Sequence, residues 1–297
     1  MESRETHMEI RLSHSTPFNL DFTLSCGQSF RWNKHGEWWY GVVKEKIFRI
    51  RQVGDKLEFE NVDADFVKDY FGLHDDMPRI FSKITRDKYI KKAVKKFEGL
   101  HILRQDPWEC LISYICATYK NVPAIRQMLF NLSKKFGDKT VFNGYDFYTF
   151  PTPARLTKAS VKELAECGLG YRARYVSETA KMIYEGNIDF ESLRKVDYEK
   201  ARQELLDFLG VGLKVADCVL LFSLGKLEAF PVDVWIKRVI LKYYANHFPS
   251  EFIRKISAKK TLANSEYERL NLFGRRYFGK YAGYAQEYLY HFEKTQR

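Results

Sequence analysis

Cysteine is scarce in this 297-residue chain, and its pattern excludes several kinds of site. The five cysteines are scattered over positions 26, 110, 116, 167 and 218, and no C-x-x-C pair occurs. Their odd number and their spacing argue against a disulfide framework and against a zinc site. An iron–sulfur cluster would need four suitably spaced thiolates. We therefore expect a reducing compartment, no metal and no cofactor.

Long apolar runs are also missing. No stretch of 18 consecutive apolar residues occurs, so we expect no transmembrane helix. The first ten residues, MESRETHMEI, lack the apolar core of a secretion signal. Both absences favour a cytoplasmic protein without membrane contact.

Positive charge and aromatic rings are present in excess. Lysine and arginine number 49 against 38 acidic residues, which gives a net charge of +11. Such a balance favours polyanionic partners, because binding releases their counterions. Aromatic residues make up 16% of the chain and suit contact with unstacked nucleobases, although most of them must belong to the core. On charge alone, an ordinary basic protein remains the alternative.

The two parts of the chain differ in pattern. Residues 9–62 contain short β-rich runs separated by turn signals, namely EWWYGVV, KIFRIRQ and KLEFENV. From about residue 63 onward the pattern is helical. The sequence predicts an α+β fold, with a small N-terminal antiparallel sheet domain over residues 8–95. An all-helical domain with two subdomains is expected over residues 96–297.

Capping residues predict where several helices begin. Asn121 should cap a helix with Pro123 in its first turn, and Ser160 should start a helix that Gly168 ends. Ser265 and Glu268 match a capping box at the start of YERLNLFGRRYF.

The most informative stretch, at about residues 198–224, predicts a helical hairpin. The amphipathic run YEKARQELLDFL is followed by Gly210-Val211-Gly212 and then by a second helical run, LKVADCVLLFSL. Two close glycines allow the backbone to approach a phosphate, and the start of the second helix offers free N–H groups. A purely structural turn is the alternative.

Lys214 lies in the first turn of the second predicted helix. The positive end of the helix dipole disfavours its ammonium there and favours the neutral amine that a lysine nucleophile needs. Cys218 and Phe222 follow four and eight residues later, on the same helix face. They would wall a pocket if Lys214 faces one, and otherwise they are core residues, with Lys214 a solvated surface lysine.

Asp233 directly precedes the apolar helical run VWIKRVILKYY and should be its N-cap. A carboxylate held near Lys214 would also stabilise positive charge that develops on a sugar. The structural and the chemical role are compatible.

The segment from Gly210 to Cys218, together with Pro231-Val232-Asp233, resembles the helix-hairpin-helix and Gly-Pro-Asp signature of DNA glycosylases. The variant with Lys214 and Cys218 is similar to the 8-oxoguanine DNA glycosylase and AP lyase family. Four further blocks agree with it in order: CGQSFRW at 26–32, LRQDP at 103–107, GLGYRARY at 168–175 and YAGYAQ at 281–286.

The resemblance implies a role for each matching position. Lys214 would attack the anomeric carbon of the sugar, and Asp233 would stabilise the oxocarbenium-like transition state. The flipped base would meet the Gly27 carbonyl at its N7 proton, the Gln286 amide at its Watson–Crick edge, and Cys218 and Tyr290 on its two faces, with Phe222 nearby. The residues expected to contact DNA are Gly210, Gly212, Tyr171, Arg172, Tyr119 and Trp235. Without the resemblance, the alternative interpretation is that these are ordinary turn, core and surface residues.

Three positions depart from the family pattern. Tyr119 and Ala124 stand where the family carries an asparagine and an arginine that read the orphaned cytosine, and Tyr290 replaces the usual phenylalanine. Tyr119 stacks on any base, and Arg172 remains as a possible donor to the acceptor edge of cytosine. A relaxed preference for the opposite base follows.

The resemblance implies a bifunctional DNA glycosylase and β-lyase that excises 8-oxoguanine from double-stranded DNA. We expect a monomer, associated with DNA in the cytoplasm of a bacterium or an archaeon. A non-catalytic helix-hairpin-helix DNA-binding protein is the main alternative, and a lyase that acts only on abasic sites is another. The presence of both Lys214 and Asp233 favours the enzyme.

Overall fold

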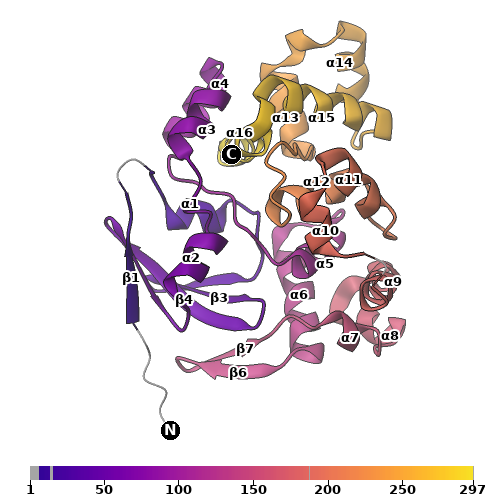
Figure 1. Ribbon diagram of the computed structural model, residues 1–297. Helices are drawn as coiled ribbons and strands as arrows, with labels where there is room; N and C mark the ends of the chain where they lie inside the picture. The colour runs from indigo at the N-terminus through magenta and orange to yellow at the C-terminus, as the bar shows by residue number, and fades with distance from the viewer. Residues whose placement is uncertain (1–6, 14–15, 187, 297) are drawn as a thin grey trace.

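The computed structural model describes residues 7–13, 16–186 and 188–296. A small antiparallel sheet occupies one side, and a larger assembly of helices occupies the other (Figure 1). The expected α+β fold, with the sheet first and the helices after it, is confirmed.

The sheet has five antiparallel strands in the order β1-β5-β4-β3-β2. The predicted β-rich runs form its centre, and turns at Gly36 and Gly54, each with φ of +59°, join neighbouring strands. An aromatic core, with Trp32 and Phe48 edge to face at 5.0 Å, packs beneath the helix α2. The outer strands β1 and β2 were not predicted. The bounds are β1 His7–Arg11, β2 Trp32–His35, β3 Trp38–Val43, β4 Lys46–Val53, β5 Lys56–Glu60, α1 Leu20–Ser25 and α2 Ala64–Tyr70.

The helical part follows the sheet and contains one small β-hairpin. The apolar helix α5 lies at its centre and packs against α6, α9 and α12, as its nearly uniform apolar sequence predicts. The helices run α3 Met77–Ile84, α4 Lys88–Lys96, α5 Pro107–Ala117, α6 Val122–Phe136, α7 Pro153–Leu156, α8 Val161–Leu164, α9 Arg172–Tyr184, α10 Phe190–Lys195, α11 Tyr198–Leu206, α12 Leu213–Phe222, α13 Val234–Tyr243, α14 Ser250–Ser257, α15 Asn264–Phe278 and α16 Ala282–Lys294. The hairpin consists of β6 Lys139–Phe142 and β7 Tyr145–Tyr148.

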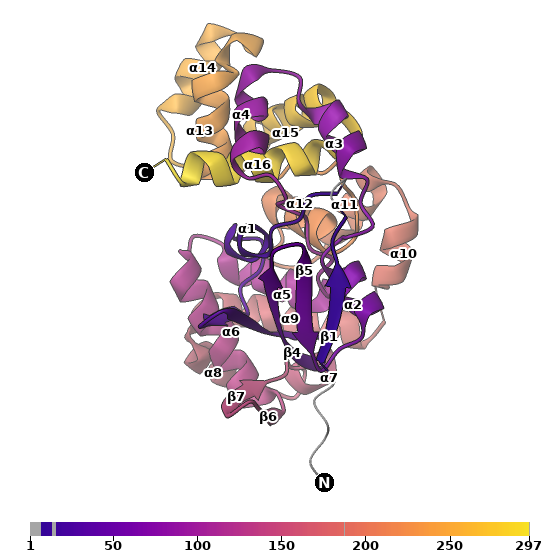
Figure 2. The same ribbon diagram turned by 90° about the vertical axis from the view of Figure 1, so that its left-hand side faces the viewer.

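The C-terminal helix α16 packs against elements from both ends of the chain. It contacts α3 and α4 as well as α13 and α15 (Figure 2). Helices α3 and α4 therefore share the core of the helical part, although the predicted boundary at residue 95 assigns α3 and nearly all of α4 to the sheet domain. The division into two domains at that residue stays a prediction.

Side-chain caps set most of the predicted helix starts. Asn121 accepts from the backbone N–H of Ala124, and Ser160 and Glu163 form a reciprocal capping box. The capping box expected at Ser265 and Glu268 is wrong, because α15 begins one residue before Ser265. There, Glu266 accepts from the backbone N–H of Ala263 at 2.9 Å.

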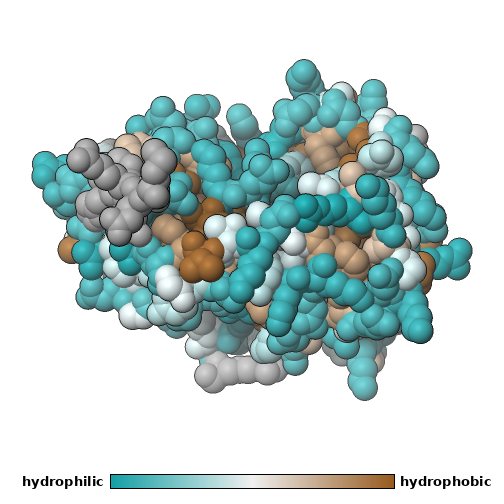
Figure 3. Space-filling view, turned by 90° about the horizontal axis from the view of Figure 1, so that it is seen from below, coloured by the Kyte–Doolittle hydropathy of each residue, from teal (hydrophilic) through white to brown (hydrophobic). Residues whose placement is uncertain are grey.

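A membrane-spanning helix needs both length and a predominantly apolar sequence. None of the helices in the residues that the structure describes combines the two. Seen from below, the molecule shows mainly hydrophilic side chains, with hydrophobic ones in separate small areas (Figure 3).

Candidate active site

The helical hairpin forms as the sequence predicts. Helices α11 and α12 are joined by the segment from Gly210 to Gly212. Gly210 has φ of +84°, and a Cβ atom there would lie 2.3 Å from the ring of Tyr175, so only glycine fits. Gly212 is the N-cap of α12 and supplies no side-chain cap. The first N–H groups of α12 are therefore suited to bind an anionic group such as a phosphate.

A buried polar network fixes α12 in place. Asp217 is fully buried and accepts from the hydroxyls of Tyr198 and Tyr267, each at 2.5 Å. Its carboxylate also lies 3.0 Å from Nε of Arg202 and accepts from Asn271 Nδ2 at 3.0 Å. The network ties α12 to α11 and α15 and so fixes the start of α12. No local pattern predicted this network, because its members are far apart in the chain.

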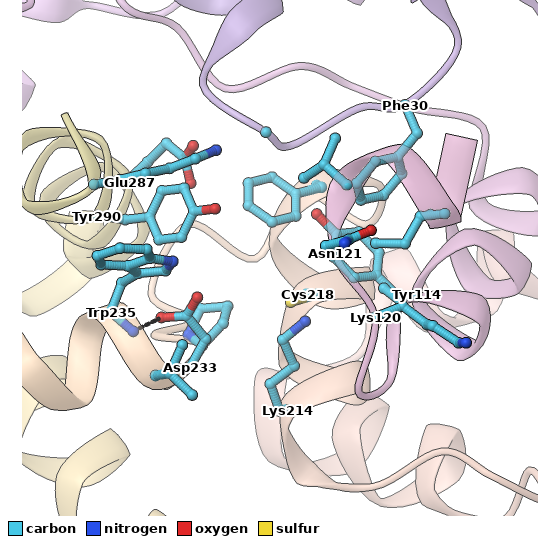
Figure 4. Close-up of a pocket in the computed structure, with 18 of the residues that line it drawn as sticks. Phe30, Tyr114, Lys120, Asn121, Lys214, Cys218, Asp233, Trp235, Glu287 and Tyr290 are labelled. Atoms are coloured by element: carbon cyan, nitrogen blue, oxygen red, sulfur yellow. Dashed lines mark hydrogen bonds between the residues drawn. The ribbon is translucent and has the colours of Figure 1, made fainter. Parts of the chain in front are cut away.

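Lys214 occupies the first turn of α12 and extends into a cavity of about 420 Å³ (Figure 4). Its Nζ lies 4.9 Å from the ring centroid of Tyr114. Tyr114 stacks on Phe222 at 5.7 Å, so the two rings form one wall of the cavity. A cavity of this size, lined mainly by apolar groups with a few polar ones, is typical of a small-molecule or base site.

Asp233 lines the same cavity from the start of α13. Its Oδ1 accepts from the backbone N–H groups of Trp235 at 2.9 Å and Ile236 at 2.8 Å, which confirms the predicted N-cap. Burial raises the pKa of the Asp233 carboxyl, whereas these N–H groups and the Lys214 ammonium lower it. Lys214 and Asp233 thus face one cavity from the starts of two helices.

The cavity also holds the residues predicted to meet the base. Gly27, Cys218, Gln286 and Tyr290 all line it, together with Phe222. Gly27 has φ of +109°, and a Cβ atom there would lie 3.3 Å from the hydroxyl of Tyr290. The close approach and the positive φ both call for glycine. In Figure 4, Tyr290 extends from α16 on the side opposite Cys218.

The loop that carries Gly27 is held by the next residue. Gln28 is buried, and its amide donates to the backbone carbonyls of Thr23 at 3.0 Å and His101 at 2.8 Å. Its side-chain oxygen accepts from the backbone N–H of Leu103 at 2.8 Å. These bonds connect the motif CGQSFRW to the motif LRQDP and give both a positioning role.

The residues predicted to contact DNA do not all reach the surface. Tyr119 and Tyr171 are 80% and 55% exposed, and Trp235 lines the cavity. Arg172, in contrast, is buried, and its guanidinium donates to the backbone carbonyls of Leu169 and Thr118. In this arrangement Arg172 holds the backbone next to Tyr119 and presents no donor to solvent.

Sequence reasoning missed several groups that line the cavity. These are Phe30, Tyr114, Lys120, Lys294 and Glu287. Phe30 lies within the motif CGQSFRW and Glu287 directly after YAGYAQ, so proximity to a motif was the available signal. No group of His, Cys, Asp and Glu in the described part of the chain is arranged to hold a metal ion.

Known proteins resemble this chain over most of its length. Residues 9–111 match the family model for the N-terminal domain of 8-oxoguanine DNA glycosylase, and residues 112–260 match that for the HhH-GPD superfamily base excision DNA repair proteins. The chain is 34% identical to an N-glycosylase/DNA lyase of Saccharomyces cerevisiae, covering 90% of this chain and 81% of the relative. It is 30% identical to the N-glycosylase/DNA lyase OGG1 of Arabidopsis thaliana, covering 95% and 78%.

A solved structure shows the same fold. The 8-oxoguanine glycosylase/lyase of Clostridium acetobutylicum, bound to double-stranded DNA with cytosine opposite 8-oxoguanine, superposes with a TM-score of 0.84 at 33% identity. The alignment covers 94% of this chain and 92% of that one. The chain therefore belongs to the HhH-GPD superfamily of DNA-binding base excision repair proteins and, within it, to the family of N-glycosylase/DNA lyase enzymes.

Proposed function

We propose that this enzyme excises 8-oxoguanine from double-stranded DNA and then cuts the strand by β-elimination. The observation that carries the proposal is the placement of Lys214 and Asp233 in one cavity that Gly27 and Tyr290 also line. A non-catalytic DNA-binding protein has no need for an amine and a carboxylate in one such cavity. The relatives named above support the same activity.

Lys214 supplies the nucleophile. Its neutral amine attacks C1′ of the flipped nucleotide, the C1′–N9 bond breaks, and the departing base takes up a proton. The resulting N,O-acetal opens as the C1′–O4′ bond breaks and O4′ takes up a proton. This leaves an imine between Lys214 and C1′, which acidifies C2′. Loss of a C2′ proton then expels the 3′-phosphate, and the strand is cut.

Asp233 acts on the transition state of base excision. Positive charge develops on the sugar ring as the glycosidic bond breaks, and a nearby carboxylate stabilises it. Its two bonds to backbone N–H groups fix the position of the carboxylate, so little reorganisation is needed during the reaction.

The base end of the cavity selects the lesion. The Gly27 carbonyl accepts a hydrogen bond from N7–H, which 8-oxoguanine has and guanine lacks, and with guanine two acceptors would face each other. Cys218 and Tyr290 enclose the two faces of the base, and Gln286 reads its Watson–Crick edge. Gln286 Oε1 is buried and has no hydrogen-bond partner within the described chain, as expected of a group that awaits a base.

The DNA contacts follow from exposure and charge. Gly210, Gly212 and the start of α12 bind the backbone, and Tyr171 and Tyr119 enter the gap that the flipped base leaves. We propose that the enzyme acts as a monomer on DNA in the cytoplasm of a bacterium or an archaeon, with a relaxed preference for the opposite base.

The direct test is incubation with a duplex that contains one 8-oxoguanine, in the presence of borohydride. Reduction of the imine should leave the protein covalently attached to the DNA, and a parallel reaction without borohydride should give free 8-oxoguanine and a cut strand. A matched duplex with guanine is the control. Cutting of the guanine duplex at the same rate, or no attachment to either duplex, would rule out the proposed function.

A further inference from the structure

The cavity contains a second carboxyl group, Glu287, which the proposed reaction does not use. Glu287 lies on α16 directly after Gln286, is 2% exposed and lines the cavity. Its Oε1 has no hydrogen-bond partner in the part of the chain that the structure describes, and the Cys26 thiol is the group that bonds to the carboxyl. An unsatisfied oxygen on a buried carboxyl is costly, so its presence calls for a ligand or a proton.

The surroundings of Glu287 favour its neutral form near pH 7. Burial raises the pKa of its carboxyl to about 7, and the charge of Asp233 contributes to the rise. The Cys26 thiol beside it and the Lys294 ammonium lower the pKa. The other titratable groups that face it are Tyr114, Cys218 and Tyr290, whose own pKa values lie above neutrality. A neutral carboxyl offers one O–H donor and one acceptor.

The position of Glu287 corresponds to one atom of the base. Along the edge of 8-oxoguanine, O6 lies between N7 and N1. In the proposed function the Gly27 carbonyl meets N7–H and Gln286 meets the Watson–Crick edge. Glu287 follows Gln286 in the chain and lies beside Cys26, which precedes Gly27. Its carboxyl therefore lines the same cavity as the two groups that would bracket O6.

We propose that Glu287 is a specificity-determining residue that donates a hydrogen bond from its neutral carboxyl to O6 of the flipped base. The enzyme then prefers 8-oxopurines with a 6-oxo group to those with a 6-amino group. This inference rests on the proposed function and deepens it.

The ionisation of Glu287 sets the sign of the pH dependence. Below its pKa the carboxyl is a donor and fits O6 of 8-oxoguanine. Above its pKa it is only an acceptor, which repels O6 and fits the amino group of 8-oxoadenine. The ratio of the two excision rates should therefore fall as the pH rises through about 7. Effects on Lys214 and Asp233 act on both substrates and cancel in the ratio.

The test measures single-turnover excision of 8-oxoguanine and of 8-oxoadenine, each opposite cytosine, between pH 6 and pH 8. In the wild type, the rate for 8-oxoguanine divided by the rate for 8-oxoadenine should be roughly tenfold higher at pH 6 than at pH 8. A tenfold change corresponds to the free energy of about one hydrogen bond. Glu287→Gln removes the titration, so the ratio should no longer depend on pH. Glu287→Met should lower the ratio at pH 6 by roughly tenfold.

Glu293→Gln is the matched control. Glu293 lies on the same helix and is also buried, but it bonds to Lys242 and Tyr243 outside the cavity. The Glu293→Gln variant should show the same pH dependence of the rate ratio as the wild type. Lys294→Met removes another donor that lines the cavity, and the ratio should still fall with pH. The fall should move to higher pH, because the Lys294 ammonium lowers the pKa of Glu287.

Several results would overturn the inference. These are a wild-type ratio that does not change with pH, an equal loss on both bases in Glu287→Met, or a selectivity that disappears with Lys294→Met. Affinity for a non-hydrolysable 2′-fluoro 8-oxoguanine duplex separates the two proposals. If the wild type neither binds that duplex more tightly than its guanine counterpart nor excises the lesion, the proposed function and this inference both fail.

Discussion

Lys214 and Asp233 lie at the starts of two consecutive helices and line one cavity. Burial raises the pKa of the Asp233 carboxyl, and the Lys214 ammonium opposes that rise. Each residue is held by its own helix, Lys214 through the first turn of α12 and Asp233 through the N-cap of α13. The pairing of amine and carboxylate is therefore built from two local structures that tertiary packing brings together.

Lys214→Gln should abolish covalent attachment to DNA under borohydride, because glutamine cannot form an imine. Binding of the lesion duplex should be largely kept, since Gly210 and Gly212 remain. Two other lysines, Lys120 and Lys294, line the cavity, so the matched control is Lys120→Gln, which should still be trapped. Trapping of Lys214→Gln would show that another amine is the nucleophile. The readout is the slower-migrating protein–DNA band on a denaturing gel.

Asp233→Asn should slow base excision more than it weakens binding, because the carboxylate acts on the transition state. The amide oxygen of asparagine can still accept from Trp235 and Ile236, so the cap remains. Asp233→Ala loses the cap as well and should be less stable by about 1 kcal/mol. Single-turnover rates and urea unfolding separate the two effects. Equal losses of affinity and rate in the asparagine variant would argue for a purely structural role.

Asp233 should also produce the acid limb of the pH profile. Its carboxylate is the active form, and burial raises its pKa, so excision should fall as the pH drops through that raised pKa. Asp233→Asn has no carboxyl to titrate and should lack this limb. An unchanged acid limb in that variant would assign the titration to another group.

DNA affinity should depend strongly on salt, because the chain carries a net charge of +11. Each phosphate contact contributes about −0.9 to the slope of log affinity against log salt concentration. Four lysines of α4 are exposed, at positions 91, 92, 95 and 96. A Lys91→Ala/Lys92→Ala double variant should flatten the slope by about 0.9 for each lysine that contacts a phosphate. If the DNA affinity of the wild type did not change with salt concentration, contacts with many phosphates would be ruled out.

The preference for the opposite base should be weak. Ala124 supplies no donor, Arg172 is engaged with backbone carbonyls, and the exposed Tyr119 stacks on any base. Each missing bidentate pair removes roughly 1–3 kcal/mol of discrimination. Single-turnover excision of 8-oxoguanine opposite the four bases should therefore give rates that differ only modestly. Excision opposite cytosine that is about a hundredfold or more faster than excision opposite adenine would contradict this expectation. A preference of that size is more than one bidentate pair typically provides.

Asp217→Ala should lower the free energy of unfolding by about 3–5 kcal/mol, because Arg202 would stay buried beside an empty site. The pair of the exposed Glu199 with the half-buried Arg275 gives the contrast, since Glu199→Gln should cost about 1 kcal/mol or less. Urea unfolding followed by circular dichroism measures both. A small loss in Asp217→Ala would mean that water replaces the carboxylate in the network.

The sequence by itself determined the features that depend on neighbours in the chain. Asn121, Ser160 and Asp233 satisfy backbone groups two or three residues away, so their caps were predictable. The Gly-x-Gly turn and the place of Lys214 in the first turn of α12 are local in the same sense. The family motifs then assigned roles to these positions.

Only the tertiary structure decided the features that depend on distant contacts. Gly27 meets Tyr290 across almost the whole chain, and Glu287 becomes a cavity residue because α16 packs beside the loop of Cys26. Arg172 was expected at the surface, but the fold turns its guanidinium toward the carbonyl of Thr118. Burial and hydrogen-bond partners are set by which segments the core brings together, and no local pattern encodes that choice.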